Sequence, residues 1–239
     1  MKYLRSYQFL FDSPKWLTNL LAGTVALLVP IVGQMVLLGY VFEILEALHL
    51  HPEAIYPDFN TNRLSKYLNR GVWPFLADFV VRLVFGMLMV PVFGVVFFVL
   101  FIGLAAAGGD NKEASGVFFL VFGCFYVLLI IVVNLLLPLV VTPILLRAGI
   151  TQDFGAAFSF EFLKDFVGKM WVEMVLAQLF LMFTSTIIGL IGFLACFVGV
   201  FPAAALVSFA HGYLLFELYE LYLQRGGTEI PLKAEPTAY

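Results

Sequence analysis

The sequence predicts an all-α membrane protein, a polytopic bundle of transmembrane helices. Of its 239 residues, 62% are hydrophobic and only 12% are charged, whereas soluble domains are about 45–50% apolar and about 25% charged. The mean hydropathy is +1.01. The apolar runs are long and continuous, which excludes the alternating strands of a membrane β-barrel. These observations also exclude soluble, disordered and coiled-coil classes.

The number of spans follows from the runs that contain no Asp, Glu, Lys or Arg. These runs are residues 16–42, 83–109, 114–146 and 174–216. A spanning helix needs about 20 such residues, so the second and third runs predict one helix each. The fourth would be roughly 65 Å long as a single helix, over twice the bilayer. We therefore expect it to turn within the glycine- and proline-containing segment 189–202, which gives about five spans.

The first run contains a helix-breaking residue at its middle. Pro30 removes a helical hydrogen bond and kinks the chain, and Gly33 follows it closely. The run is either one kinked span or a re-entrant pair of half-helices, and in the second case other protein must cover the non-helical backbone.

An internal two-fold repeat is predicted within one integral membrane domain. We divide the chain into an N-terminal interfacial segment (1–15), a first half (16–146), a second half (147–223) and a polar tail (224–239). In each half, Asp-Phe precedes about a dozen residues that end in Gly and Trp, and Gly-Tyr follows a proline by about ten residues. The matching positions are Asp58-Phe59 with Asp153-Phe154, Gly71 and Trp73 with Gly168 and Trp171, and Gly39-Tyr40 with Gly212-Tyr213.

Two short amphipathic helices are expected where these Asp-Phe pairs occur. The first has three cations on one face, and the second has phenylalanines every four residues along one stripe. Helices of this kind lie in the membrane interface. They either contact lipid or a partner, or act only as interfacial linkers that shield the edge of the bundle. The candidate contact residues are Arg63, Lys66, Arg70, Phe158, Phe162 and Phe166.

Three ionisable residues near or within the apolar runs are further candidates. Asp78 and Arg82 are four residues apart, and either line a polar path or form an interfacial ion pair. His211 lies well inside an apolar run, where it would ligate haem or chlorophyll, or make an interhelical hydrogen bond. No metal site and no other cofactor are predicted.

Other classes of function are disfavoured by what the sequence lacks. The net charge is −3 and there is no basic block, so we do not expect a nucleic-acid partner. There is no phosphate-binding loop, nucleophile elbow or pair of catalytic carboxylates, so we do not expect an enzyme.

The N-terminal part of the chain carries a recognisable pattern of structural residues. Its members are Trp16, Gly23, Pro30, Gly33 and Gly39-Tyr40, followed by Pro57-Asp58. With this pattern the chain resembles the polytopic bacterial and archaeal membrane family called domain of unknown function 4013, from about residue 16 to residue 222. The resemblance implies a fold but no catalytic residue. More distantly, the layout resembles the membrane domains of some glycerophosphodiester phosphodiesterases, whose catalytic residues are not present here.

The leading functional hypothesis is a non-enzymatic accessory or scaffold subunit that packs against lipids and other integral membrane proteins. The alternative is a transporter or pore for a small or lipid-like substrate, formed by the two halves or by a homo-oligomer. If the second and third runs form a simple up-down pair, eight Lys and Arg residues of the connections and tail fall on one face, while the loop at 110–113 has only Lys112. The positive-inside rule therefore predicts a prokaryotic inner-membrane protein whose C-terminus and amphipathic helices are cytoplasmic.

Overall fold

A computed structural model describes residues 1–50, 57–107, 112–195 and 198–233, and every regular element among them is a helix. Five of these helices, α3, α4, α5, α7 and α8, are long and apolar enough to cross a membrane, as predicted. The helices are α1 (Arg5–Phe11), α2 (Trp16–Leu28), α3 (Val32–Leu50), the 3-10 turn η1 (Thr61–Arg63), α4 (Leu64–Ala107), α5 (Lys112–Thr151), α6 (Phe154–Ala157), α7 (Phe160–Leu194) and α8 (Val200–Gln224).

The first apolar run forms two helices rather than one kinked helix. Helix α2 ends before Pro30, and Ile31 has a φ of 64°, in the left-handed region that reverses the chain. Helices α2 and α3 then pack against each other. With 13 residues, α2 rises about 20 Å, which is too short to cross about 30 Å of hydrocarbon.

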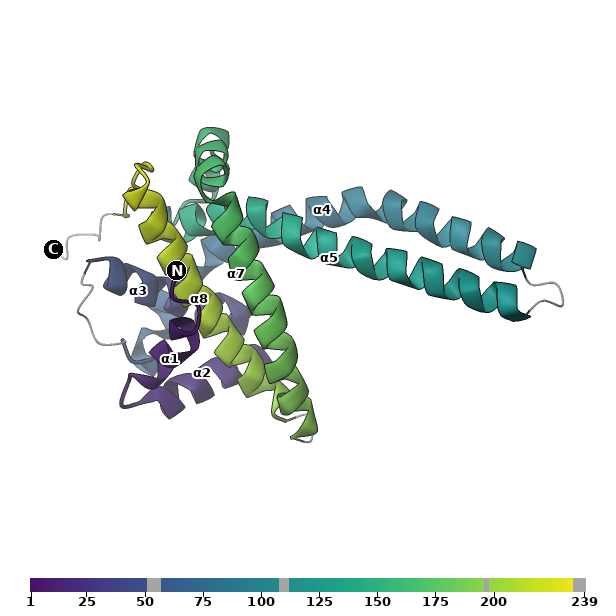
Figure 1. Ribbon diagram of the computed structural model, residues 1–239. Helices are drawn as coiled ribbons and strands as arrows, with labels where there is room; N and C mark the ends of the chain where they lie inside the picture. The colour runs from purple at the N-terminus through teal and green to yellow at the C-terminus, as the bar shows by residue number, and fades with distance from the viewer. Residues whose placement is uncertain (51–56, 108–111, 196–197, 234–239) are drawn as a thin grey trace. The chain divides into compact units, whose positions relative to one another are not determined.

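The fourth apolar run turns inside the predicted segment. Helix α7 ends at Leu194 and α8 begins at Val200, and the two helices lie side by side (Figure 1). The carbonyl of Gly199 lies 2.6 Å from where a Cβ on Gly192 would be, so only small residues permit this close approach.

The two predicted amphipathic helices are not separate elements. The first is the beginning of α4, because nothing interrupts the helix between Leu64 and the following span. The second is divided into α6 and the start of α7. The Asp153 carboxylate caps α6 by accepting the Gly155 and Ala156 amides, and the Ser159 hydroxyl caps α7 by accepting the Phe162 amide.

The chain divides into two compact units, which we describe separately. The first comprises residues 1–78 and 138–239, and the second comprises residues 79–137. Helices α4 and α5 each continue from one unit into the other. The two predicted sequence halves stay a prediction, but α8, from the second half, packs against α2 and α3 of the first.

The core of the first unit is formed where α3 and α8 meet α1, α2 and the first turns of α4. Tyr40 and Tyr67 are each 1% exposed, and Phe209 of α8 meets the Tyr40 ring edge-on at 5.9 Å. The Tyr40 hydroxyl donates to the Pro57 carbonyl at 2.7 Å, which holds Pro57 against α3.

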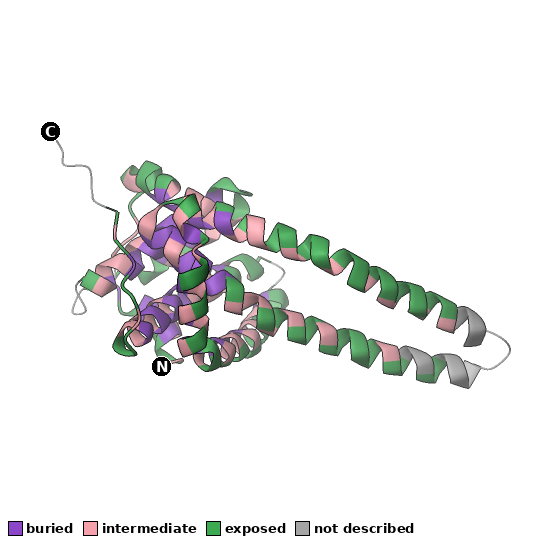
Figure 2. Cartoon of the chain, turned by 90° about the horizontal axis from the view of Figure 1, so that it is seen from above, coloured by how far each residue is buried: buried purple, intermediate pink, exposed green. Residues whose placement is uncertain are grey.

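The second unit consists of the outer parts of α4 and α5, and none of the side chains whose burial is described there is buried within the chain. Figure 2 shows its helices coloured as exposed and intermediate, whereas the buried positions gather in the first unit. The two helices contact each other through the rings of Phe93 and Tyr126, 5.9 Å apart.

Candidate functional site

Two of the predicted cations, Arg63 of η1 and Arg70 of α4, lie beside acidic residues of α3. Arg63 forms an ion pair with Glu43, and its guanidinium lies 6.0 Å from the centre of the Tyr67 ring. Arg70 is only 3% exposed and forms an ion pair with Glu46. Lys66 is exposed. Arg63 and Arg70 therefore form ion pairs between elements of the first unit. The predicted lipid contacts of the three cations stay a prediction.

The predicted phenylalanine stripe is mostly internal. Phe162 and Phe166 are 6% and 0% exposed, and their rings lie 5.6 Å and 4.7 Å from that of Tyr222 on α8. Phe158, in contrast, is 40% exposed. The stripe thus joins α7 to α8, and only Phe158 of the predicted set is available to lipid.

A polar cavity of about 720 Å³ adjoins this aromatic cluster. In its lining, Asp165 accepts hydrogen bonds from Lys169 at 2.7 Å and from the Tyr222 hydroxyl at 2.6 Å. Arg147 also lines it, 5.2 Å above the Phe162 ring. We did not predict this cluster; its sequence signal was Arg147, the first charge after a long apolar run.

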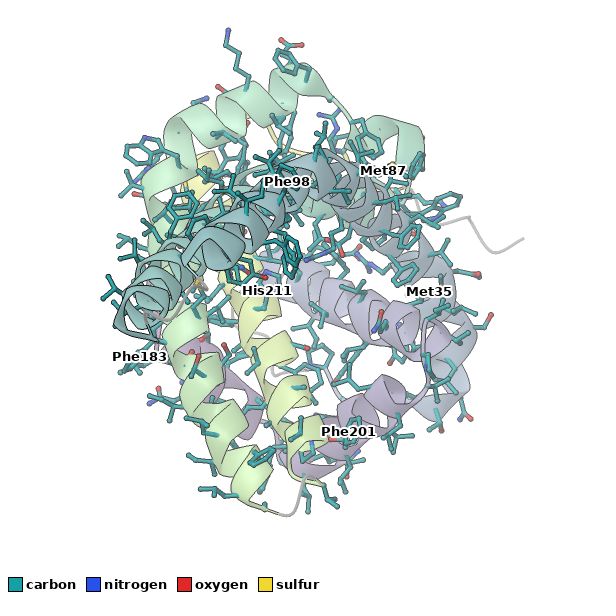
Figure 3. The ribbon with its side chains drawn as sticks, turned by 90° about the vertical axis from the view of Figure 1, so that its right-hand side faces the viewer. Met35, Met87, Phe98, Phe183, Phe201 and His211 are labelled. Carbon is teal, nitrogen blue, oxygen red and sulfur yellow. The ribbon has the colours of Figure 1, made fainter. Side chains whose placement is uncertain are left out.

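A smaller cavity of about 270 Å³ brings together two of the predicted candidates. Asp78 of α4 and His211 of α8 line it, together with Gln34 of α3 and Ser208 of α8. Figure 3 labels His211, which projects from α8. Arg82 is exposed one turn further along α4. Sequence reasoning treated Asp78 and His211 as unrelated, because their proximity depends on how α4 and α8 pack.

Across the described ranges, no three His, Cys, Asp or Glu residues lie close enough together to hold a metal ion. His211, which lines the same cavity as Asp78, is the residue that would ligate a haem or chlorophyll, and this role stays a prediction.

A third cavity, larger than these two, is an amphipathic groove of about 1010 Å³, bounded by α2, α3 and the beginning of α4. Apolar side chains line most of the length of the groove, and polar side chains line one of its ends. The apolar residues include Leu21, Val25, Val29, Val32, Val36 and Leu68, and the polar ones include Lys15, Asp58, Asn60, Thr61 and Ser65.

Hydrogen bonds organise the polar end of this groove. The carboxylate of Asp58 accepts hydrogen bonds from the Ser13 hydroxyl at 2.8 Å and the Asn19 amide at 3.2 Å, and lies 3.4 Å from the Lys15 ammonium. Asn19 is fully buried, and its carbonyl accepts the Phe59 amide at 2.9 Å. The Ser13 bond lowers the pKa of Asp58 against the opposing effect of burial, and Asn19 and Lys15 lower it further.

Sequence reasoning missed this network. Asn19 gave the only signal, as an amide near the start of an otherwise apolar run, where a polar group must find a partner. Its partners lie about 40 residues away, and only the folded chain brings them together.

These features define a polytopic helical membrane protein whose polar and ionisable groups are paired in small internal clusters. A family model described as "Protein of unknown function (DUF4013)" matches residues 22–197, so the chain belongs to that family, as the resemblance indicated. Searches of curated proteins and of solved structures found no match.

Proposed function

We propose that this protein is a non-enzymatic accessory or scaffold subunit that docks against other integral membrane proteins through the second unit, residues 79–137. The observation that supports this most is how little of that unit packs within its own chain. In the most apolar stretch of α4 no residue is buried, and in that of α5 6% are, compared with 56% in α3 and 39% in α8.

The composition of this surface favours protein contact. Phe97, Phe98 and Phe101 of α4 are 74%, 65% and 69% exposed. Aromatic side chains provide large contact areas and are enriched in the buried centres of protein interfaces. Aliphatic side chains would contact lipid equally well. The aromatic side chains on this surface therefore favour contact with a partner protein.

Native mass spectrometry of the protein, extracted gently in its own lipids, tests the proposal. We expect a second protein at fixed stoichiometry, and we expect it to be lost when Phe97, Phe98 and Phe101 are all replaced by Leu. These replacements keep the helix apolar enough to insert. The matched control is Phe183→Leu, which changes a phenylalanine of α7 that is 70% exposed. A homo-oligomer that carries only lipid would exclude the accessory role.

The second candidate is a transporter or pore for a small substrate, with the cavity between Asp78 and His211 as its site. An ionisable residue within membrane-spanning helices often marks an ion or proton path. Purified protein in liposomes that contain a pH-sensitive dye would then conduct protons, and Asp78→Asn would abolish the signal. Equal leakage from protein-free liposomes would exclude proton conduction.

The proposed location is a prokaryotic inner membrane, with the C-terminus and the amphipathic beginnings of α4 and α7 in the cytoplasm. The positive-inside rule supports this orientation, and the proposed repeat would place both beginnings on one side. A C-terminal alkaline phosphatase fusion should be inactive in intact cells, since that enzyme needs the periplasm. An active fusion would reverse the topology.

A further inference from the structure

We propose that the groove bounded by α2, α3 and the start of α4 binds one membrane phospholipid, with an acyl chain along α2 and its phosphate at Lys15. This site lies in the first unit and goes beyond the docking function proposed for residues 79–137.

The groove has the length of a lipid tail. Its lining on α2 runs from Lys15 to Val29, which is about 21 Å of helix. One leaflet of hydrocarbon is about 15 Å deep, half of about 30 Å. The groove is therefore long enough to hold an acyl chain from a single leaflet. Its volume of about 1010 Å³ is at the upper limit of the range of about 300–1,000 Å³ for ligand pockets.

The apolar wall is open along α2. Leu21 and Val25 line the groove and are 53% and 60% exposed. Leu21 follows Thr18 by three residues and Val25 follows Leu21 by four, so the three residues form one stripe of the helix. The groove ends at the Pro30 turn, where α2 stops before it has crossed the membrane.

The other end presents a cation to the position of a head group. The Lys15 side chain is 67% exposed, and its 3.4 Å separation from the Asp58 carboxylate occupies at most one of its three N–H donors. Asp58 is held in place independently by Ser13 and Asn19. Lys15 can therefore donate to a phosphate oxygen without losing its position.

The apolar wall and the charged end together favour a phospholipid over a partner helix. A helix of spanning length would need an apolar surface of about 30 Å. The groove offers about 21 Å, and its end is closed by charged and hydroxyl groups. A molecule with one charged end and one apolar tail satisfies both parts.

Lipid retention in native mass spectrometry tests the site. The probes are phosphatidylethanolamine, phosphatidylglycerol and diacylglycerol with the same acyl chains, each added to delipidated full-length protein. We expect one tightly retained phospholipid and at least tenfold weaker retention of diacylglycerol, which has no phosphate. Lys15→Gln should weaken phospholipid retention about tenfold, the effect of a charge-assisted hydrogen bond. Val25→Trp, which fills the groove, should abolish it.

Matched variants separate this site from general changes in folding or charge. Leu17→Trp changes an exposed leucine of α2 that does not line the groove, and Lys66→Gln removes an exposed cation elsewhere. Both should retain the phospholipid, and all variants should keep the helical circular dichroism of the original protein. The proposal would be overturned if the Val25→Trp and Lys15→Gln variants retained the phospholipid as well as the original protein does. It would also be overturned if diacylglycerol bound as tightly as phospholipid, or if a protein, rather than a lipid, were retained. The triple phenylalanine variant of α4 should keep the lipid whether or not the docking proposal holds.

Discussion

At the scale of single residues, the first unit depends on charges that are buried and paired. Arg70 is almost fully enclosed, and Glu46 provides its ion-pair partner from the neighbouring helix α3. A buried charge without a partner costs far more than the pair contributes, because the remaining group keeps its desolvation penalty. The pair therefore restricts how α3 and α4 can pack against each other.

Glu46→Gln should destabilise the protein by about 3 kcal/mol, at the low end of the range for breaking a buried pair, because the Glu46 side chain is 26% exposed. Thermal unfolding in detergent would measure the loss. The control is Glu161→Gln, an exposed glutamate of α7, for which we expect less than about 1 kcal/mol. Similar losses in the two variants would mean that the Arg70 pair has no special role.

Asp58 gives the protein a pH-dependent element of stability. Its pKa is lowered in the folded chain, chiefly by the Ser13 hydroxyl, so folding favours its charged form. Such a group stabilises the fold above the unfolded pKa of about 3.9, and the contribution is lost as the pH falls through the lower folded pKa.

Asp58→Asn should therefore unfold at a lower temperature than the original protein near neutral pH, and the difference should shrink as the pH falls below about 4. Melting temperatures measured from pH 6 to pH 2 would show this. Ser13→Ala, which removes the main hydrogen bond, should make the difference smaller at neutral pH. A difference that is constant over this range would show that the Asp58 charge does not stabilise the fold.

At the scale of elements, α3 and α4 cross with their backbones in contact. A Cβ at Gly39 would collide with the Tyr67 carbonyl, and a Cβ at Gly71 would collide with the Met35 carbonyl. Glycines at such crossings let two membrane helices approach more closely than any other residue allows. This crossing positions the start of α4 as one wall of the groove.

Gly39→Ala and Gly71→Ala should each destabilise the protein by about 1–3 kcal/mol or more, because rigid backbone atoms occupy the space of the added methyl group. Gly86→Ala and Gly94→Ala are the controls. They lie in α4 with nothing within 4 Å of the added Cβ, so alanine should stabilise the helix by up to about 1 kcal/mol. Thermal unfolding distinguishes the two pairs, and equal effects would contradict the close crossing.

At the scale of the whole molecule, the first unit contains the packed core that stabilises the fold, and the second unit contains exposed apolar side chains. The first unit contains the core around Tyr40, Tyr67 and Phe209. The second unit exposes large apolar side chains, such as Met87 at 64% and Phe98 at 65%; Figure 3 shows both on α4. Substitutions in the two units should therefore affect different properties.

Phe209→Ala should lower the melting temperature clearly, whereas Phe98→Ala should leave it almost unchanged. Phe209 is 4% exposed and packs on Tyr40, so its loss leaves a cavity. We expect less than the about 3–5 kcal/mol typical of soluble cores, because unfolded side chains remain in lipid rather than water. A larger loss from Phe98→Ala would show that the second unit contributes to the core.

The sequence by itself determined that the chain is a bundle of membrane helices, that its first and fourth apolar runs break at Pro30 and within residues 189–202, and which family it belongs to. These properties follow from the length of charge-free runs, the breaks at Pro30 and near Gly199, and local caps such as Asp153. Only the tertiary structure decided what covers each amphipathic face. The spacing of charged and aromatic residues predicts that Arg70 and Phe166 each lie on one face of an amphipathic helix. Either lipid or protein can cover such a face. In this protein α3 covers Arg70 and α8 covers Phe166. The groove at Lys15 and the cavity at Asp78 likewise arise from contacts between distant segments, which no local pattern encodes.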